Sequence, residues 1–280
     1  MVPPVASVSG LRDLTVVHDK RTKLRELLKE HAPLVIAYSG GVDSTYLLAE
    51  AVDVLGDNAL GVIADSPSLP RAALAEALAT APASGARVEV VKTLELDNPD
   101  YAANPPNRCY FCKAELFQRL DLLAQQRGHT AIAYGENADD VHQERPGRIA
   151  AEKFRVLAPL RDAGLTKAEI RALSRELNLP TAESPAQPCL SSRIPWGTPV
   201  TPDALSMVEH AEEAMRKFGF SVFRVRHLAV PGGTPRARVL IAPNEMPLLA
   251  QTRSQLDAAV RGAGYAEVEI DPEGYRGPSA

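Results

Sequence analysis

The 280-residue sequence has only three cysteines and one tryptophan, and no apolar run approaches the ~20 residues that a membrane-spanning helix needs. Three cysteines are too few for a disulfide framework, which indicates a reducing compartment. The first residues, MVPPVASVSGLRD, lack the basic start and apolar centre of a signal peptide. We therefore expect a cytoplasmic protein that does not associate with membranes.

The chain also lacks an excess of positive charge. Its 31 Lys and Arg residues are outnumbered by 35 Asp and Glu residues, so the net charge is −4. Proteins that bind nucleic acids normally carry a basic surface, and this balance disfavours a nucleic-acid partner. A small anionic substrate held by a local basic cluster remains compatible with the composition.

Short apolar runs alternate with amphipathic segments through most of the chain. The runs PLVIAYS, ALGVIAD, ARVEVVKT and HTAIAYGE predict buried strands, and the segments between and after them predict helices. This alternation predicts an α/β fold, a parallel Rossmann-like sheet with helices on both faces. Ligands of such sheets bind beyond the carboxyl ends of the strands.

The pattern changes near Trp196. A Pro/Gly-rich linker, PWGTPVTP, is followed by segments that predict a helix, two strands, a helix and a further strand. We therefore expect one domain over residues 1–195 and a smaller α+β domain over residues 196–280. The last residues, GYRGPSA, are expected to be frayed.

The motif SGGVDS, residues 39–44, lies between the first predicted strand and the next helix. Backbone N–H groups and the positive end of the helix dipole face an anion at such a junction. Gly40 and Gly41 allow close approach of a phosphate, and Ser39 and Ser44 add hydroxyl donors. The motif predicts a phosphate site, although it is neither G-x-x-x-x-G-K-[ST] nor G-x-G-x-x-G.

A second polar motif, GENADD, runs from Gly135 to Asp140 directly after the fourth predicted strand. Mg²⁺ prefers one or two carboxylates together with phosphate oxygens and water. Asp139 and Asp140 are therefore candidate magnesium ligands. The alternative is an acidic pair at a solvated helix start.

Two of the cysteines, Cys109 and Cys112, form a C-x-x-C pair in RCYFCK, and Cys189 lies in PAQPCLSSR. Such a pair is compatible with a redox disulfide, part of a zinc or iron–sulfur site, or simple packing. Zinc needs a fourth ligand, and no histidine has the diagnostic spacing. Three thiolates on a [4Fe–4S] cluster would leave one iron without a protein ligand.

Together these motifs resemble a known family. SGGVDS and GENADD are similar to the pyrophosphate (PP) loop and the acidic segment of the ATP pyrophosphatases. RCYFCK, GENADDVHQERPG and PAQPCLSSRIPWG resemble the LarE family of ATP-dependent sulfur transferases, which act in biosynthesis of the nickel-pincer nucleotide cofactor. The resemblance extends from about Leu34 to Arg238.

The resemblance implies a two-stage reaction on pyridinium-3,5-dicarboxylate mononucleotide. ATP adenylates a ring carboxylate with release of pyrophosphate, and a sulfur nucleophile then displaces AMP to give a thiocarboxylate. By the same resemblance Asp43 helps to hold Mg²⁺, and Ala64, Asp65 and Ser66 lie near the adenosine. Family members tend to self-associate, so the resemblance also implies a homo-oligomer.

The source of the sulfur differs between branches of the family. In one branch the cysteine at the position of Cys189 gives up its own sulfur and becomes dehydroalanine. In the other branch three cysteines hold a [4Fe–4S] cluster that carries an extra sulfide. This chain has all three cysteines, so we expect cluster-mediated transfer through Cys109, Cys112 and Cys189.

Arginines alternate along two predicted strands of the C-terminal part. Arg224 and Arg226 point to one face of their strand, and Arg236 and Arg238 do the same on the next. If the strands pair, the guanidinium groups gather on one surface that suits a phosphate.

The alternative for these arginines is a solvated face balanced by Glu209, Glu212 and Glu213. The resemblance implies that Arg224 and Arg226 are an anion-binding pair. It also implies that Glu212 lies near the site and that Arg193 orients the phosphate or the substrate.

Two other functions compete with sulfur transfer to a small nucleotide. Some tRNA-thiolating enzymes also combine a pyrophosphate loop with three cysteines, although the net charge gives that reading little support. A non-catalytic nucleotide or redox sensor is the other alternative. The acidic GENADD segment beside an intact SGGVDS motif favours magnesium-dependent turnover instead.

Overall fold

The structure is a computed structural model that describes residues 8–142 and 146–275. Its chain forms two compact units. The first unit contains Met1–Asp65, Arg71–Thr93 and Cys112–Pro185, and the second contains Ser66–Pro70, Leu94–Phe111 and Ala186–Ala280. The second unit thus adds to the expected C-terminal domain two segments that follow strands of the first unit, and residues 186–195.

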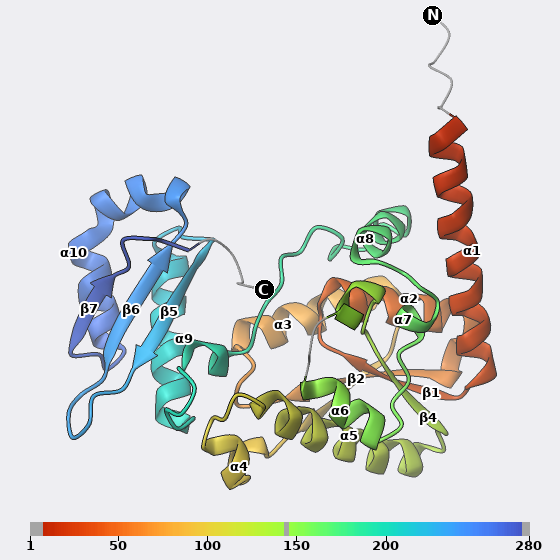
Figure 1. The fold of residues 1–280 in the computed structure, drawn as a ribbon, viewed down its shortest axis with the longest axis horizontal. Coiled ribbons are helices and arrows are strands. Elements are labelled where there is room, and N and C mark those ends of the chain that lie inside the picture. Colours follow the sequence, from red (N-terminus) through yellow and green to blue (C-terminus); the bar gives the residue numbers. More distant parts are fainter. Residues whose placement is uncertain (1–7, 143–145, 276–280) are drawn as a thin grey trace, which may run out of the picture. The chain divides into compact units, whose positions relative to one another are not determined.

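The first unit is built on a four-stranded sheet in the order β3-β2-β1-β4, and Figure 1 labels β2, β1 and β4 of this sheet. All of its strand pairs are parallel, which confirms the α/β fold class. The central strand β1 is buried at every position because apolar residues fill both of its faces. The strands are β1 (Leu34–Tyr38), β2 (Ala59–Asp65), β3 (Val88–Lys92) and β4 (Ala131–Tyr134).

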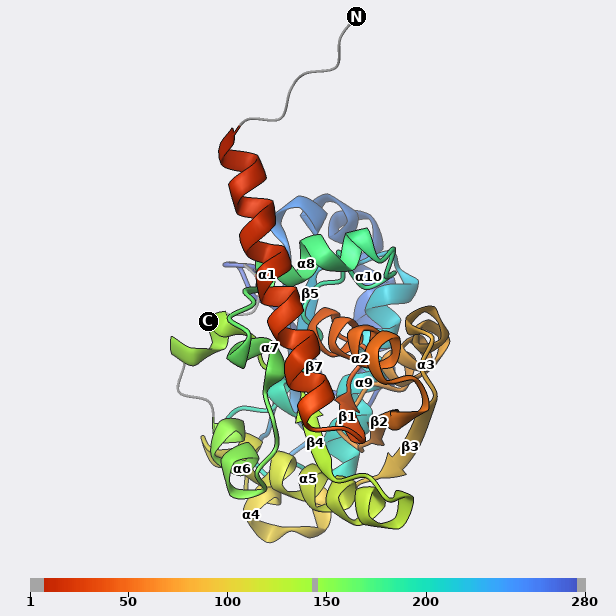
Figure 2. The ribbon, with the colours of Figure 1, turned by 90° about the vertical axis from the view of Figure 1, so that its right-hand side faces the viewer.

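Helices cover both faces of this sheet. Figure 2 shows α1 and α2 on one face and α5 on the other. The helix that follows β3 and α4 (Pro99–Ala102) begins at Arg108, within RCYFCK, so Cys109 and Cys112 lie in the first turns of α5. The helices that contribute to this unit are α1 (Val8–Glu30), α2 (Val42–Leu55), α3 (Arg71–Thr80), α5 (Arg108–Arg127), α6 (Pro146–Lys153), α7 (Pro159–Asp162) and α8 (Lys167–Glu176). None of the helices in the described residues is long and apolar enough to span a bilayer.

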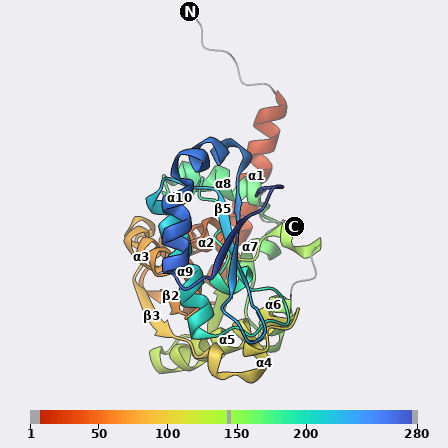
Figure 3. The ribbon, with the colours of Figure 1, turned by 90° about the vertical axis from the view of Figure 1, so that its left-hand side faces the viewer.

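The second unit contains the three-stranded sheet β5-β6-β7. Its strands are β5 (Phe223–Leu228), β6 (Arg236–Ile241) and β7 (Glu267–Ile270), and its long helices are α9 (Pro202–Lys217) and α10 (Met246–Gly262). The helices pack on one face of the sheet, as Figure 3 shows. Val225, Val239 and Val260 form part of the core between them. The opposite face carries the arginines, because side chains alternate along a strand.

Short helices complete the two units. They are η1 (Gly56–Asn58), η2 (Ala81–Ser84), η3 (Glu95–Asp97), α4 (Pro99–Ala102), η4 (Ala138–His142), η5 (Leu190–Arg193) and η6 (Pro243–Glu245). Cys189 is the residue immediately before η5, and Asp139 and Asp140 lie within η4.

Candidate active site

The SGGVDS loop joins the carboxyl end of β1 to the start of α2. Gly40 has φ +74°, and a Cβ atom there would lie 2.5 Å from the Cβ of Ala77, so only glycine fits. Ser44 Oγ accepts a hydrogen bond from Ser39 N at 3.1 Å and donates one to Gly41 O at 3.1 Å. The N-cap residue of α2 is Gly41, which has no side chain that could accept hydrogen bonds from the helix. The first N–H groups of α2 are therefore available to an anion.

The tertiary structure places GENADD against this loop. A Cβ atom on Gly135 would lie 2.9 Å from Ser44 N, so the absence of a side chain allows the two segments to touch. Asn137 Nδ2 donates to Asp43 Oδ2 at 3.4 Å. The two motifs that we expected to bind phosphate and metal therefore lie side by side.

Asp43 forms an ion pair with Lys167, whose Nζ lies 2.7 Å from Asp43 Oδ2. Burial raises the pKa of Asp43, while the hydrogen bond and charge of Lys167 act in the opposite direction and Asp140 raises the pKa further. Oδ1 of Asp43 is buried and has no hydrogen-bond partner among the described residues. That orphaned carboxylate oxygen fits the position of a cation ligand.

Sequence reasoning did not single out Lys167, the first residue of α8. The capping box of Thr166 and Glu169 fixes the start of this helix. Lys167 N donates to Asp139 Oδ2 at 2.8 Å while its side chain contacts Asp43. Nothing local in the sequence indicates the partner of the lysine.

The carboxylates of Asp139 and Asp140 are held by different groups. Asp139 Oδ2 accepts from the backbone of Lys167, and Asp140 Oδ2 accepts from Asn137 N at 3.2 Å. Across the residues that the structure describes, no group of three or more His, Cys, Asp or Glu side chains is arranged to hold a metal. The negative charge of Asp140 contributes to the raised pKa of Asp43.

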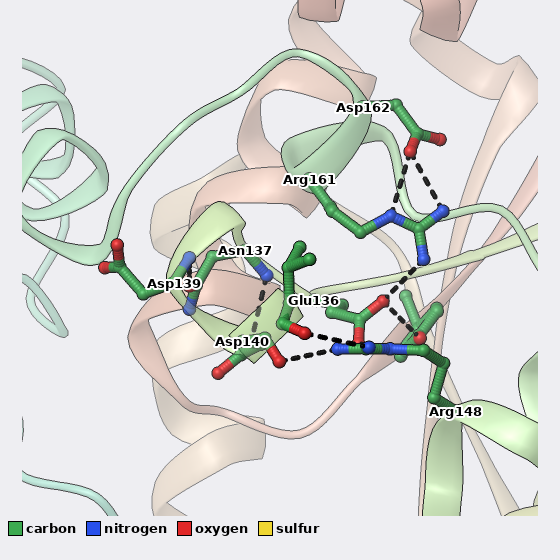
Figure 4. Close-up of polar contacts among 9 residues, drawn as sticks. Glu136, Asn137, Asp139, Asp140, Arg148, Arg161 and Asp162 are labelled. Atoms are coloured by element: carbon green, nitrogen blue, oxygen red, sulfur yellow. Dashed lines mark hydrogen bonds and ion pairs between the residues drawn. The ribbon is translucent and has the colours of Figure 1, made fainter. Parts of the chain in front are cut away.

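Glu136 anchors the GENADD segment (Figure 4). Its carboxylate accepts hydrogen bonds from Arg148 Nε at 2.8 Å, Arg161 Nη1 at 2.8 Å and the Tyr134 hydroxyl at 2.7 Å. Burial opposes ionisation of Glu136, but the hydrogen bonds from Tyr134 and Arg148 outweigh it and lower its pKa. Arg148 also donates to Asp140 O, so the cluster fixes the backbone that carries the acidic pair.

The residues expected near the adenosine lie at the carboxyl end of β2. Ala64 and Asp65 end this strand next to β1 in the first unit, and Asp65 forms an ion pair with Arg71. Ser66 belongs to the second unit, where its hydroxyl donates to Glu95.

All three cysteines lie in the described residues, and none forms a disulfide. Cys109 is exposed, while Cys112 and Cys189 are partly buried. Residues close to Cys109 and Cys189 in the chain are hydrogen-bonded to each other within the second unit. Arg108 Nη1 donates to Ser191 O at 2.9 Å. The two cysteine segments thus share one local framework.

Buried hydroxyl groups complete that framework. Ser68 Oγ lies 2.5 Å from the Tyr101 hydroxyl, and Ser191 Oγ lies 2.7 Å from both. Asn104 Nδ2 donates to the carbonyl groups of three residues that follow Cys189 in the chain, namely Ile194, Pro195 and Thr198. These bonds hold the segment around Cys189 in one conformation.

Arg193 and Glu212 form a buried bidentate pair, with Nε–Oε1 2.8 Å and Nη2–Oε2 2.9 Å. Only 3% of Arg193 and 1% of Glu212 are exposed. Nη1 of Arg193 also donates to Cys189 O at 3.0 Å, and Val225 N donates to Glu212 Oε1 at 3.3 Å. In this geometry the pair joins the Cys189 segment to α9 and β5.

The predicted arginine surface forms on β5 and β6, which pair in antiparallel fashion with Arg226 opposite Arg238. Glu267 and Glu269 of β7 lie 3.9 Å and 3.4 Å from Arg236 and Arg238, which are therefore charge-balanced.

Arg224 and Arg226 on the same face are not charge-balanced in this way. Within residues 8–142 and 146–275, neither Arg224 nor Arg226 forms an ion pair with a carboxylate. Burial and the nearby charge of Arg193 lower the pKa of Arg224, although arginine stays protonated in proteins. Arg224 and Arg226 are thus the guanidinium groups on this face that remain available to an anion.

No family model matches the sequence. The chain is 40% identical over 263 residues to an uncharacterised protein of Synechocystis, a match that covers 93% of this chain and 96% of that protein. It is 30% identical over 259 residues to the pyridinium-3,5-bisthiocarboxylic acid mononucleotide synthase of Lactiplantibacillus plantarum, with 92% of each chain covered. It is also 26% identical over 263 residues to an uncharacterised protein of Methanocaldococcus jannaschii, a match that covers 92% of this chain and 97% of that protein.

Proposed function

The chain belongs to the LarE family of sulfur transferases, and on that basis we propose that it thiolates a pyridinium dicarboxylate mononucleotide in an ATP-dependent reaction. The product would be a thiocarboxylate used for the nickel-pincer nucleotide cofactor. The observation that carries this proposal is the end-to-end similarity to the Lactiplantibacillus plantarum synthase.

The first unit supplies groups for adenylation. In the proposed step a carboxylate oxygen of the substrate attacks the α-phosphorus of ATP, the bond to the β-phosphate oxygen breaks, and pyrophosphate leaves. The SGGVDS backbone and the start of α2 would bind the phosphates. Asp43 and Asp140 would hold Mg²⁺, which neutralises charge on the phosphate oxygens when it is bound.

The second unit supplies groups for sulfur transfer and substrate binding. A sulfur nucleophile would attack the carbonyl carbon of the acyl adenylate, the bond to the phosphate oxygen would break, and AMP would leave. Arg224 and Arg226 would bind the phosphate of the nucleotide substrate. This cationic pair lies in the same unit as Cys189, and Arg193 connects the Cys189 segment to β5 through Glu212.

The chemistry of Cys109, Cys112 and Cys189 fits an iron–sulfur cluster, because thiolates are the usual ligands of such clusters, although the three side chains are not arranged as a metal site in the described residues. We propose these three residues as ligands of a [4Fe–4S] cluster. When bound, the cluster would supply an extra sulfide at the iron that lacks a protein ligand. The hydrogen bond from Arg108 to Ser191 supports the proposal, since it ties Cys109 and Cys189 to one framework.

The test is pyrophosphate release by protein purified without oxygen. We expect release only when ATP, Mg²⁺ and the dicarboxylate mononucleotide are all present. The same protein should contain about four iron and four acid-labile sulfide atoms per chain, and Cys109→Ala should lose both. Absence of pyrophosphate release with this substrate would overturn the proposed function. Absence of iron, with conversion of Cys189 to dehydroalanine after turnover, would overturn the cluster alone.

A further inference from the structure

The segment after β7 does not leave the second unit. Asp271 N donates to Val239 O at 2.9 Å, and Tyr275 N donates to Ile241 O at 2.9 Å. Tyr275 is only 8% exposed. The expectation of a frayed tail is therefore wrong for Tyr275, and residues 276–280 lie outside the described part of the chain.

A tight turn brings Tyr275 to this position. Gly274 has φ +69°, and a Cβ atom there would lie 2.7 Å from Ile241 O. Gly274 N donates to Asp271 O at 3.2 Å, and Glu273 N donates to Asp271 Oδ1 at 2.9 Å. Only glycine combines this backbone conformation with so close an approach to β6.

The ring of Tyr275 lies against Arg224. The guanidinium carbon is 4.8 Å from the ring centroid, within the range of a cation–π contact. The hydrogen bond that Arg224 makes in this structure runs from Nη1 to Phe223 O at 3.0 Å. The aromatic ring thus restrains a half-buried cation whose remaining donors have no hydrogen-bond partner in the part of the chain that the structure describes.

The hydroxyl of Tyr275 is the unexplained feature. It is buried, and it has no hydrogen-bond partner among the described residues. A buried hydroxyl without a partner is unfavourable, whereas phenylalanine would pack the same ring at no such cost. The group beside it, Arg224, is a cation that has no carboxylate partner among the described residues, so the missing acceptor is best supplied by an anion.

We propose that Tyr275 is an additional residue of the anion site, with its ring positioning Arg224 and its hydroxyl donating to a phosphate oxygen of the bound mononucleotide. This inference rests on the proposed function, which assigns the substrate phosphate to Arg224 and Arg226. Because the phenol oxygen is shielded from solvent, a small rotation of the Tyr275 or Arg224 side chain must accompany binding.

The experiment measures the dissociation constant of nicotinic acid mononucleotide by calorimetry, with the riboside that lacks the phosphate as the reference ligand. We expect Tyr275→Phe to weaken mononucleotide binding about tenfold, the value of one hydrogen bond to a charged group, and to leave riboside binding unchanged. In an Arg224→Ala background the same change should have less than about a twofold effect, since the two residues act together.

Tyr265→Phe is the matched control, because Tyr265 is a buried tyrosine of the same unit whose hydroxyl lies 3.3 Å from His227 Nδ1. It should bind the mononucleotide as the unaltered protein does. Gly274→Ala should displace the tyrosine without removing it and weaken binding at least as much as Tyr275→Phe.

The outcomes separate the two proposals. If Tyr275→Phe binds the mononucleotide normally while Arg224→Ala binds it weakly, Tyr275 is only a packing residue and the anion site stands. If the unaltered protein does not distinguish the mononucleotide from the riboside, the anion site itself is wrong. Pyrophosphate release tests the adenylation step of the proposed function and does not depend on either binding result.

Discussion

Lys167 Nζ and Asp43 Oδ2 lie 2.7 Å apart, although 124 residues separate them in the chain. The contact joins the start of α8 to the start of α2, where the SGGVDS loop ends. It places a cation beside the carboxylate that we propose as a ligand of Mg²⁺. The pair therefore sets the charge of the candidate nucleotide site.

Replacing Asp43 should abolish adenylation. We expect Asp43→Asn to reduce pyrophosphate release at least about 100-fold, because the variant loses a charged ligand where phosphate charge develops. The alkylation rate of the cysteines should not change. Asp53→Asn is the control, since Asp53 lies on the same helix, is exposed and pairs with Arg25. Undiminished release by Asp43→Asn would remove the magnesium assignment.

Removing the positive charge of Lys167 should change the pH dependence of adenylation. Burial raises the pKa of Asp43 and Lys167 opposes that rise, so Lys167→Met should raise the pKa further. A protonated carboxylate binds Mg²⁺ poorly, and activity is therefore lost as pH falls through this pKa. We expect the acid limb of kcat/KM for pyrophosphate release to move to higher pH in Lys167→Met and to stay in place in Lys167→Arg. A shift to lower pH, or none, would contradict this account.

The buried hydroxyl cluster should stabilise the second unit. Tyr101→Phe removes one hydroxyl and leaves Ser68 and Ser191 each with one partner fewer. We expect the free energy of unfolding in urea to fall by about 1–3 kcal/mol. The alkylation of Cys189 should also become faster, because Ser191 helps to hold its segment. Ser206→Ala, at an exposed hydroxyl of α9, should change the stability by less than about 0.5 kcal/mol. Equal stability of Tyr101→Phe and Ser206→Ala would argue against the cluster.

The Arg193–Glu212 pair should matter for both stability and thiol reactivity. Glu212→Gln leaves a buried guanidinium without its carboxylate, which costs about 3 kcal/mol of unfolding free energy. Because Arg193 donates to Cys189 O, a loosened Arg193 should also speed alkylation of Cys189. Glu213→Gln, at the neighbouring and less buried position, is the control. A stability loss with unchanged alkylation would restrict the pair to a packing role.

Much of the first unit was predictable because its signals are local. The four apolar runs become the four strands of the parallel sheet within two residues at each end. SGGVDS and GENADD follow β1 and β4, which pair in the sheet, so both motifs emerge at one edge. The same local reasoning could not find Glu136, because the partners that make it important, Arg148 and Arg161, come from α6 and α7.

The parallel sheet and the SGGVDS turn follow from the amino-acid sequence, because strand period and glycine geometry are properties of neighbouring residues. Which charged side chains pair with each other depends on the tertiary structure. It paired Lys167 with Asp43, balanced Arg236 and Arg238 with glutamates, and covered Arg224 with Tyr275. Such pairs depend on side-chain positions set by packing between distant segments, and no short stretch of sequence specifies them.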